Sequence, residues 1–168
     1  SFISDSTVVI TVGTPVDNFL NPDMRQIKEC IDSLIPYLKK GQLIILRSTV
    51  YPGTSDWLYK YLSKKKKCDI AFCHERVIQG YTFDEIEKLP QIIAASSKKA
   101  LNRASLIFKK ISKKIVYCSL KEAEFSKLFS NSFRYAQFAI ANEFYMLADK
   151  AGLDFNKIRK IKKDGYPR

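Results

Sequence analysis

Long apolar runs, a secretory leader and closely spaced cysteines are all missing from this 168-residue sequence. No apolar stretch reaches the ~18 residues that a membrane span requires, so we expect no membrane partner. Residues 1–12 have neither the basic start nor the cleavage site of a signal peptide. The four cysteines form no C-x-x-C pair, and a single histidine cannot anchor a metal cluster. We therefore expect a cytoplasmic protein with reduced thiols and no bound metal.

Acidic residues are scarce relative to basic ones, and the net charge is +12. One interpretation is nucleic-acid binding through phosphate contacts, and the other is a lysine-rich, solvated surface. The 22 lysines outnumber the 7 arginines, and they occur in scattered pairs. They are not interleaved with aromatic side chains that could stack on bases. We expect no nucleic acid partner, although a basic surface could attract a small anionic substrate.

Apolar strand patterns alternate with helical patterns along the first two thirds of the chain. The expected strands are 7–12, 42–46, 69–73, 92–95 and 115–117, and the expected helices between them are 23–38, 56–63, 83–89 and 98–110. Residues 7–12 are a continuous β-branched run, which predicts a strand buried on both faces. The alternation favours an α/β fold with a parallel sheet.

The pattern changes near Cys118 from α/β to helix alone. Residues 119–152 predict one long helix, with a capping box formed by Ser119 and Glu122. This helix is apolar on more than one side, so it needs partners on several faces. It places Lys127 and Asn131 one turn apart on the same face. A last helix is expected from about residue 154 to 163.

Three of the expected strands end in loops rich in hydroxyl groups, glycine and proline: GTP at 13–15, STVYPGT at 48–54 and HERVIQG at 74–80. Ligands of open α/β sheets bind at the carboxyl ends of the strands, so these loops predict a ligand site. Glu75 is the only acid in them, and the alternative to a catalytic role is a salt bridge with Arg76 or Arg47. The G-x-G-x-x-G signature of a dinucleotide site occurs nowhere in the sequence. Either other strands flank residues 7–12, or the chain is a fragment.

Several motifs together carry a family resemblance: VGTP at 12–15, RSTVYPGT at 47–54, FCHERVIQGY at 72–81, LPQII at 89–93, EAEFSKLFSNSFR at 122–134 and ANE at 141–143. In order and spacing they resemble the nucleotide-sugar 6-dehydrogenases, that is, the UDP-glucose and UDP-N-acetylhexosamine dehydrogenases. The ERVIQG and LPQII segments are most similar to the UDP-N-acetyl-mannosamine or -glucosamine branch. The resemblance implies the second half of a Rossmann-like parallel sheet followed by a long central helix. Residues 1–118 would be a partial NAD-binding α/β domain, and residues 119–168 a central helical region that forms a homodimer.

The resemblance also implies a reaction and a set of functional residues. The C6 alcohol of a UDP-N-acetylhexosamine is oxidised to a carboxylate, two NAD⁺ are reduced, and a cysteine holds the intermediate as a thiohemiacetal and then a thioester. The implied catalytic residues are Lys127 and Asn131, which stabilise the oxyanion, Glu75 as the base for thioester hydrolysis, and Thr49 near the nicotinamide and the water. The implied NAD-binding residues are Thr14, Pro15, Ser48, Thr49 and Glu75. The implied substrate-binding residues are Val77, Ile78, Gln79, Gly80, Lys127, Asn131 and Arg168. Without the resemblance, a solvated lysine and a capped amide explain Lys127 and Asn131 as well as a catalytic role does.

The sequence departs from the family pattern at several points. His74 stands where the family usually has proline, and Gln79 where the UDP-glucose branch often has glutamate. The nucleophilic cysteine of the family lies in a glycine-rich segment that these residues do not include, and Cys73 and Cys118 are outside that motif. We therefore expect part of a dehydrogenase that is inactive by itself. The alternative is a non-catalytic dimerisation module or truncated remnant.

Overall fold

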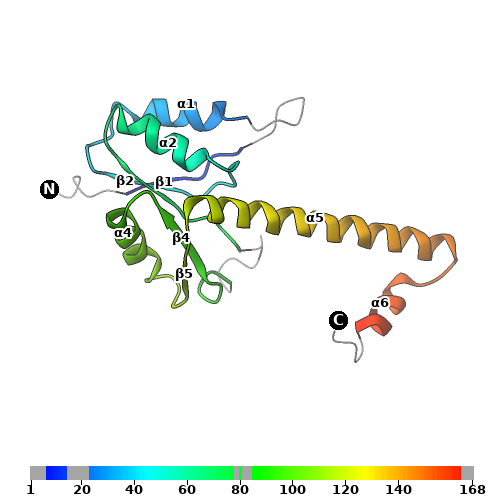
Figure 1. The fold of residues 1–168 in the computed structure, drawn as a ribbon. Coiled ribbons are helices and arrows are strands. Elements are labelled where there is room, and N and C mark those ends of the chain that lie inside the picture. Colours follow the sequence, from blue (N-terminus) through cyan, green and yellow to red (C-terminus); the bar gives the residue numbers. More distant parts are fainter. Residues whose placement is uncertain (1–6, 15–22, 78–79, 81–84, 164–168) are drawn as a thin grey trace. The chain divides into compact units, whose positions relative to one another are not determined.

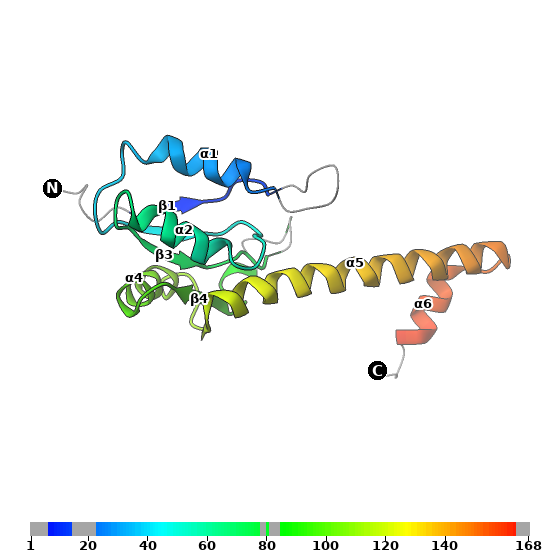
Figure 2. The ribbon, with the colours of Figure 1, turned by 45° about the horizontal axis from the view of Figure 1, so that its top comes forward.

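The computed structural model describes residues 7–14, 23–77, 80 and 85–163. Five strands form one sheet in the order β1-β2-β3-β4-β5, and helices lie on both of its faces (Figures 1 and 2). The strands are β1 Thr7–Ile10, β2 Leu43–Leu46, β3 Asp69–Phe72, β4 Gln91–Ala95 and β5 Ile115–Tyr117. The helices are α1 Arg25–Leu34, α2 Thr54–Ser63, α4 Lys98–Phe108, α5 Leu120–Lys150 and α6 Phe155–Lys163. Of the short helix expected at 83–89, residues 85–86 are helical and 81–84 lie outside the described residues.

The direction of the strands changes once within the sheet. β1, β2 and β3 run parallel, β4 runs antiparallel to β3, and β5 runs parallel to β4. The expected parallel sheet therefore contains one antiparallel step, between β3 and β4. The segment after β3 enters β4 at the same edge at which β3 ends, so it does not cross a face as a βαβ connection does. The α/β class, with a mostly parallel sheet followed by a long helix, is confirmed.

The core lies in two layers, one on each face of the sheet. Successive side chains of a strand point to opposite faces, so the fully buried β2 contributes to both layers. One layer joins β2 and β3 to α1 and α2 through Ile27, Ile31, Ile44, Leu46, Leu58, Leu62, Ile70 and Phe72. The other joins them to α4 through Leu43, Ile45, Ala71, Cys73, Ile93, Ala104 and Phe108. Each fully buried large apolar side chain contributes about 1.5–3 kcal/mol.

β1 is less buried than its sequence predicts. Val9 is 51% exposed, and β1 pairs with β2 alone among the described residues. α4 contacts β2, β3 and β4, and so leaves the Val9 side of β1 uncovered. The prediction that this strand is buried on both faces is therefore wrong for the described chain.

The long helix begins as the sequence predicts. The Ser119 amide donates to Glu122 Oε2 at 2.7 Å, and the Glu122 amide donates to Ser119 Oγ at 3.3 Å. The chain forms two compact units, residues 1–128 and 129–168, and α5 contributes residues to both. Within the second unit, Asp154 caps α6, and the Phe155 ring meets the Tyr145 ring edge-on at 5.7 Å. The division into domains at 118/119 stays a prediction.

Candidate functional site

The loops that follow β1 and β2 are tied together at the carboxyl edge of the sheet. Thr14 Oγ1 donates to the backbone oxygen of Thr49, and Ser48 Oγ donates to the backbone oxygen of Val12 at 2.6 Å. The two strands are hydrogen-bonded neighbours, so their ends are adjacent. Three of the predicted cofactor residues, Thr14, Ser48 and Thr49, thus lie together, whereas Pro15 is outside the described residues.

Glu75 lies just beyond the end of β3, and both of its carboxylate oxygens accept hydrogen bonds. Oε1 accepts the backbone N–H groups of Arg76 at 2.7 Å and Val77 at 3.1 Å. Oε2 forms an ion pair with Arg47, which follows β2. The Arg76 side chain instead reaches the backbone oxygen of Pro90 at 3.3 Å. Of the two salt bridges considered for Glu75, the one with Arg47 is formed.

Lys127 of α5 approaches the same strand end. Its Nζ donates to the backbone oxygen of Glu75, and its side chain is half-buried. The solvated-lysine interpretation of Lys127 is therefore wrong. Asn131 lies one turn further along α5 and belongs to the second compact unit, so its predicted role at this edge stays a prediction.

The predicted substrate loop after Glu75 is described only in part. Val77 is half-buried and donates its backbone N–H to Glu75, and Gly80 has φ of 94°, a left-handed conformation that favours glycine. Ile78, Gln79 and Arg168 lie outside the described residues, so their roles stay predictions.

Glu124 was not among the residues singled out in the sequence, yet it links α5 to this edge. It is 1% exposed, and its carboxylate accepts the backbone N–H groups of Gly53 at 2.7 Å and Ser55 at 2.8 Å. Those amides open α2, where the helix dipole favours a negative charge. The available signal was its position four residues after the buried Leu120, on the apolar face of α5.

Burial keeps two residues next to Glu75 uncharged. It raises the pKa of the Cys73 thiol to about 12, despite the opposing effect of Arg47. Burial also lowers the pKa of His74 to about 4, and Lys127, Arg76 and Arg47 add to this effect. A thiol with such a pKa is a poor nucleophile at neutral pH, which agrees with leaving Cys73 out of the predicted catalytic set.

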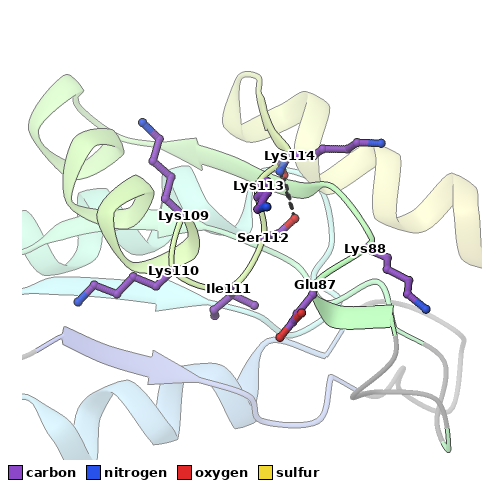
Figure 3. A pocket seen from close by; sticks show the side chains of 8 residues that line it. All are labelled: Glu87, Lys88, Lys109, Lys110, Ile111, Ser112, Lys113 and Lys114. Atoms are coloured by element: carbon purple, nitrogen blue, oxygen red, sulfur yellow. Dashed lines mark hydrogen bonds between the residues drawn. The ribbon is translucent and has the colours of Figure 1, made fainter.

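A hollow of about 520 Å³ lies away from the predicted site residues, beside the turn between α4 and β5 (Figure 3). It is lined by Glu87, Lys88, Lys109, Lys110, Ile111, Ser112, Lys113 and Lys114. The Ser112 hydroxyl is already hydrogen-bonded to the backbone of Leu89, and Lys88 and Lys109 point to opposite sides of the view. Within the described chain, no group of three or more His, Cys, Asp or Glu side chains could hold a metal ion. The same residues include no helix long and apolar enough to cross a membrane.

The five-stranded sheet, the loops tied together at its carboxyl edge and the helix that follows define an α/β domain of the kind that binds ligands at this edge. The model of the UDP-glucose/GDP-mannose dehydrogenase family, NAD binding domain, matches residues 3–112, and that of the family's central domain matches residues 121–165. The chain therefore belongs to the UDP-glucose/GDP-mannose dehydrogenase family. This confirms the resemblance read from the sequence, and with it NAD as the cofactor.

Individual relatives agree with this assignment. A UDP-N-acetyl-D-mannosamine dehydrogenase of Methanocaldococcus jannaschii is 37% identical over 150 residues, covering 87% of this chain and 35% of the relative. One of Pyrococcus horikoshii is 31% identical over 153 residues, covering 87% of this chain and 36% of the relative. The solved UDP-D-ManNAc dehydrogenase of P. horikoshii aligns with a TM-score of 0.86 at 28% identity, over 98% of this chain and 41% of that one. The chain thus spans about a third of the length of the curated relatives it matches.

Proposed function

We propose that this chain is part of an NAD-dependent UDP-N-acetylhexosamine 6-dehydrogenase, which oxidises the C6 alcohol of the sugar to a carboxylate. The observation that carries the proposal is the meeting of Lys127 with the Glu75 strand end, across 52 residues of sequence, in a chain of this dehydrogenase family. The relatives named above act on UDP-N-acetyl-D-mannosamine, so we take the manno epimer as the substrate.

In this proposal, Lys127 and Asn131 stabilise the negative charge that develops on the sugar oxygen. An ammonium group at the end of a flexible stem can favour an oxyanion, and a side-chain amide one turn further can donate to the same atom. Glu75 accepts the proton of the water that releases the acid, and Thr49 orients that water. Val77, Ile78, Gln79 and Gly80 line the sugar-nucleotide site, and Arg168 contacts it.

The groups at the carboxyl edge fit NAD. The hydroxyls of Thr14 and Ser48 donate to backbone oxygens of the neighbouring loop, and their oxygens can still accept hydrogen bonds from the ribose and the carboxamide of the cofactor. When bound, NAD supplies the acceptor of the hydride. Thr14, Pro15, Ser48, Thr49 and Glu75 would hold it. The four cysteines are free thiols, which supports a cytoplasmic location.

A second candidate is a non-catalytic module that dimerises through α5. It is favoured by the aromatic and aliphatic side chains exposed along this helix, among them Phe133, Phe138 and Phe144. Measuring the mass in solution with and without NAD⁺ distinguishes the two candidates. In the natural protein that contains these residues, a dimer that NAD⁺ neither binds nor changes supports the module and contradicts the dehydrogenase.

The proposed reaction is tested with the natural protein that contains these residues. We expect NADH formation with UDP-N-acetylmannosamine, and less with UDP-N-acetylglucosamine or UDP-glucose. Lys127→Ala should lower kcat by about 100-fold or more, as for loss of an oxyanion donor. The matched control is Lys121→Ala, on the exposed first turn of the same helix. No turnover of any UDP-sugar would refute the proposal. We further expect the isolated 168 residues to form no NADH, since they contain no G-x-G-x-x-G motif.

A further inference from the structure

Arg47 is held in place by the pairing of β1 with β2 and by α4. Its backbone N–H donates to the Ile10 oxygen at 2.9 Å, which extends the pairing of β1 and β2 beyond β2. Its guanidinium lies 5.0 Å from the centre of the Phe108 ring of α4. The side chain is only 13% exposed, so its charge has lost most of its contact with water.

A buried cation needs an anionic partner, and Glu75 is that partner here. The two residues follow neighbouring strands whose last residues, Leu46 and Phe72, are paired in register. In β2 and β3 the odd-numbered side chains point toward α4. Arg47 and Glu75 are odd-numbered residues just after these strands and follow the same alternation. The register of β2 and β3 therefore brings Arg47 and Glu75 together.

The three groups that donate to the Glu75 carboxylate differ in whether they depend on the side chain at their position. The two donors to Oε1 are backbone groups of the next residues in the chain, which any side chain at those positions would supply. Oε2 depends on the side chain of Arg47 alone among the described residues. Arg47 is therefore the group through which the sequence can tune this carboxylate.

We propose that Arg47 is the positioning residue of Glu75, fixing the plane of its carboxylate and setting how readily it accepts a proton. The inference rests on the proposed function, in which Glu75 is the base. Arginine remains protonated even when buried, so it always favours the ionised form of Glu75. A carboxylate held this way is ionised at neutral pH, holds a proton less tightly than an unpaired one, and so returns it easily.

Other charged groups also face Glu75 and must be separated from Arg47. Lys127 approaches from α5 and touches the backbone oxygen of Glu75 rather than its carboxylate. Arg76 is exposed and its guanidinium reaches Pro90. His74 and Cys73 precede Glu75, and burial keeps both neutral near pH 7. Arg47 is thus the cation in direct contact with the carboxylate, and Arg76 is a matched control.

The first experiment follows the side-chain carboxyl carbon of Glu75 by NMR during a pH titration of this chain, with Glu75→Gln to assign the signal. Arg47→Met should raise the midpoint by about one to three pH units. Arg76→Met should move it by less than about 0.3 unit, because that side chain does not touch the carboxylate. Equal shifts in the two variants, or none, would overturn the inference. If Arg47→Met does not fold, the folded wild type still tests it: Glu75→Gln must shift the guanidinium nitrogen signals of Arg47.

The second experiment uses the natural enzyme and separates positioning from a purely structural salt bridge. The rate falls at low pH when Glu75 is protonated, so Arg47→Met should move this acid limb of kcat to higher pH, together with the NMR midpoint. Arg47→Lys keeps the charge and should move the limb less. If the acid limb of the kcat profile does not move while the stability of the protein falls, the ion pair is purely structural and the inference is overturned. A wild type that turns over no UDP-sugar would refute the proposed function and the catalytic part of this inference, while the titration result would still stand for the ion pair.

Discussion

The carboxylate of Glu124, on α5, lies 2.7 Å from the backbone nitrogen of Gly53, where α2 begins. The same carboxylate accepts the N–H of Ser55 at 2.8 Å. One buried acid therefore satisfies two amides that a helix start leaves without intrahelical partners. Glu124 lies three residues before Lys127 on α5. It also fixes this part of α5 against the loop that carries Thr49. The contact of Lys127 with the backbone of Glu75 thus depends on how Glu124 holds the start of α5.

Replacing Glu124 with glutamine should destabilise the protein by about 2–3 kcal/mol, since hydrogen bonds to a charged group contribute about 1.5–3 kcal/mol and the new NH₂ faces N–H donors. Urea unfolding, followed through the single tryptophan Trp57 of α2, measures this directly. Glu122→Gln is the matched control, because Glu122 is exposed in the capping box and should cost less than about 1 kcal/mol. Equal losses in the two variants would refute the assigned role of Glu124.

The sequence predicted the local parts of this fold well. The capping box of Ser119 and Glu122 and the cap of α6 by Asp154 are encoded within four residues, and both are formed. β2 was predicted from its unbroken apolar run because that run is buried on both faces. Such features depend on neighbours in sequence, which propensity and periodicity describe.

The features that the sequence did not predict depend on distant partners. Val9 has the β-branched pattern of a buried strand, but α4 does not cover it. The antiparallel step between β3 and β4 is set by where the intervening segment enters the sheet. Glu124 meets Gly53 across 71 residues, and no spacing rule links the two. In the site, the resemblance supplied Glu75 and Lys127, whereas the choice of Arg47 over Arg76 required the register of the sheet.

Stability should fall in mild acid because of His74. Its folded-state pKa is about 4, below the ordinary value of 6.5, so the unfolded chain binds the proton more readily. The stability is fully present above pH 6.5 and is lost as the pH falls toward 4, by up to about 3 kcal/mol. Urea midpoints at pH 7.5 and 5.0 measure the loss, and His74→Gln should reduce the difference between them. An unchanged difference in that variant would assign the acid sensitivity to other groups.

A surface network joins α1 to α2 and should give one carboxyl an unusually low pKa. Asp32 accepts a hydrogen bond from Lys28 at 2.6 Å and another from the Tyr61 hydroxyl, which lower its pKa to about 2. The stabilisation by this network is fully present above pH 3.8, the ordinary pKa of Asp32, and is lost as the pH falls through about 2. An NMR titration should find this midpoint, and Lys28→Gln should raise it more than Tyr61→Phe. A midpoint near 3.8 in the wild type would show that the network does not persist in solution.

Dimerisation through α5 is expected because apolar side chains are exposed on the part of the helix that belongs to the second unit. Phe133 is 67% exposed and Leu147 64%, although both are large and apolar. If a second copy covers them, a glutamate at either position buries an unpaired charge. Phe133→Glu should then raise the dissociation constant of the dimer by about tenfold or more, as sedimentation equilibrium would show. Leu106→Glu on α4 is the matched control, since Leu106 is 68% exposed and lies outside the proposed interface. A wild-type chain that stays monomeric at high concentration, or a control that weakens the dimer equally, would contradict an interface on α5.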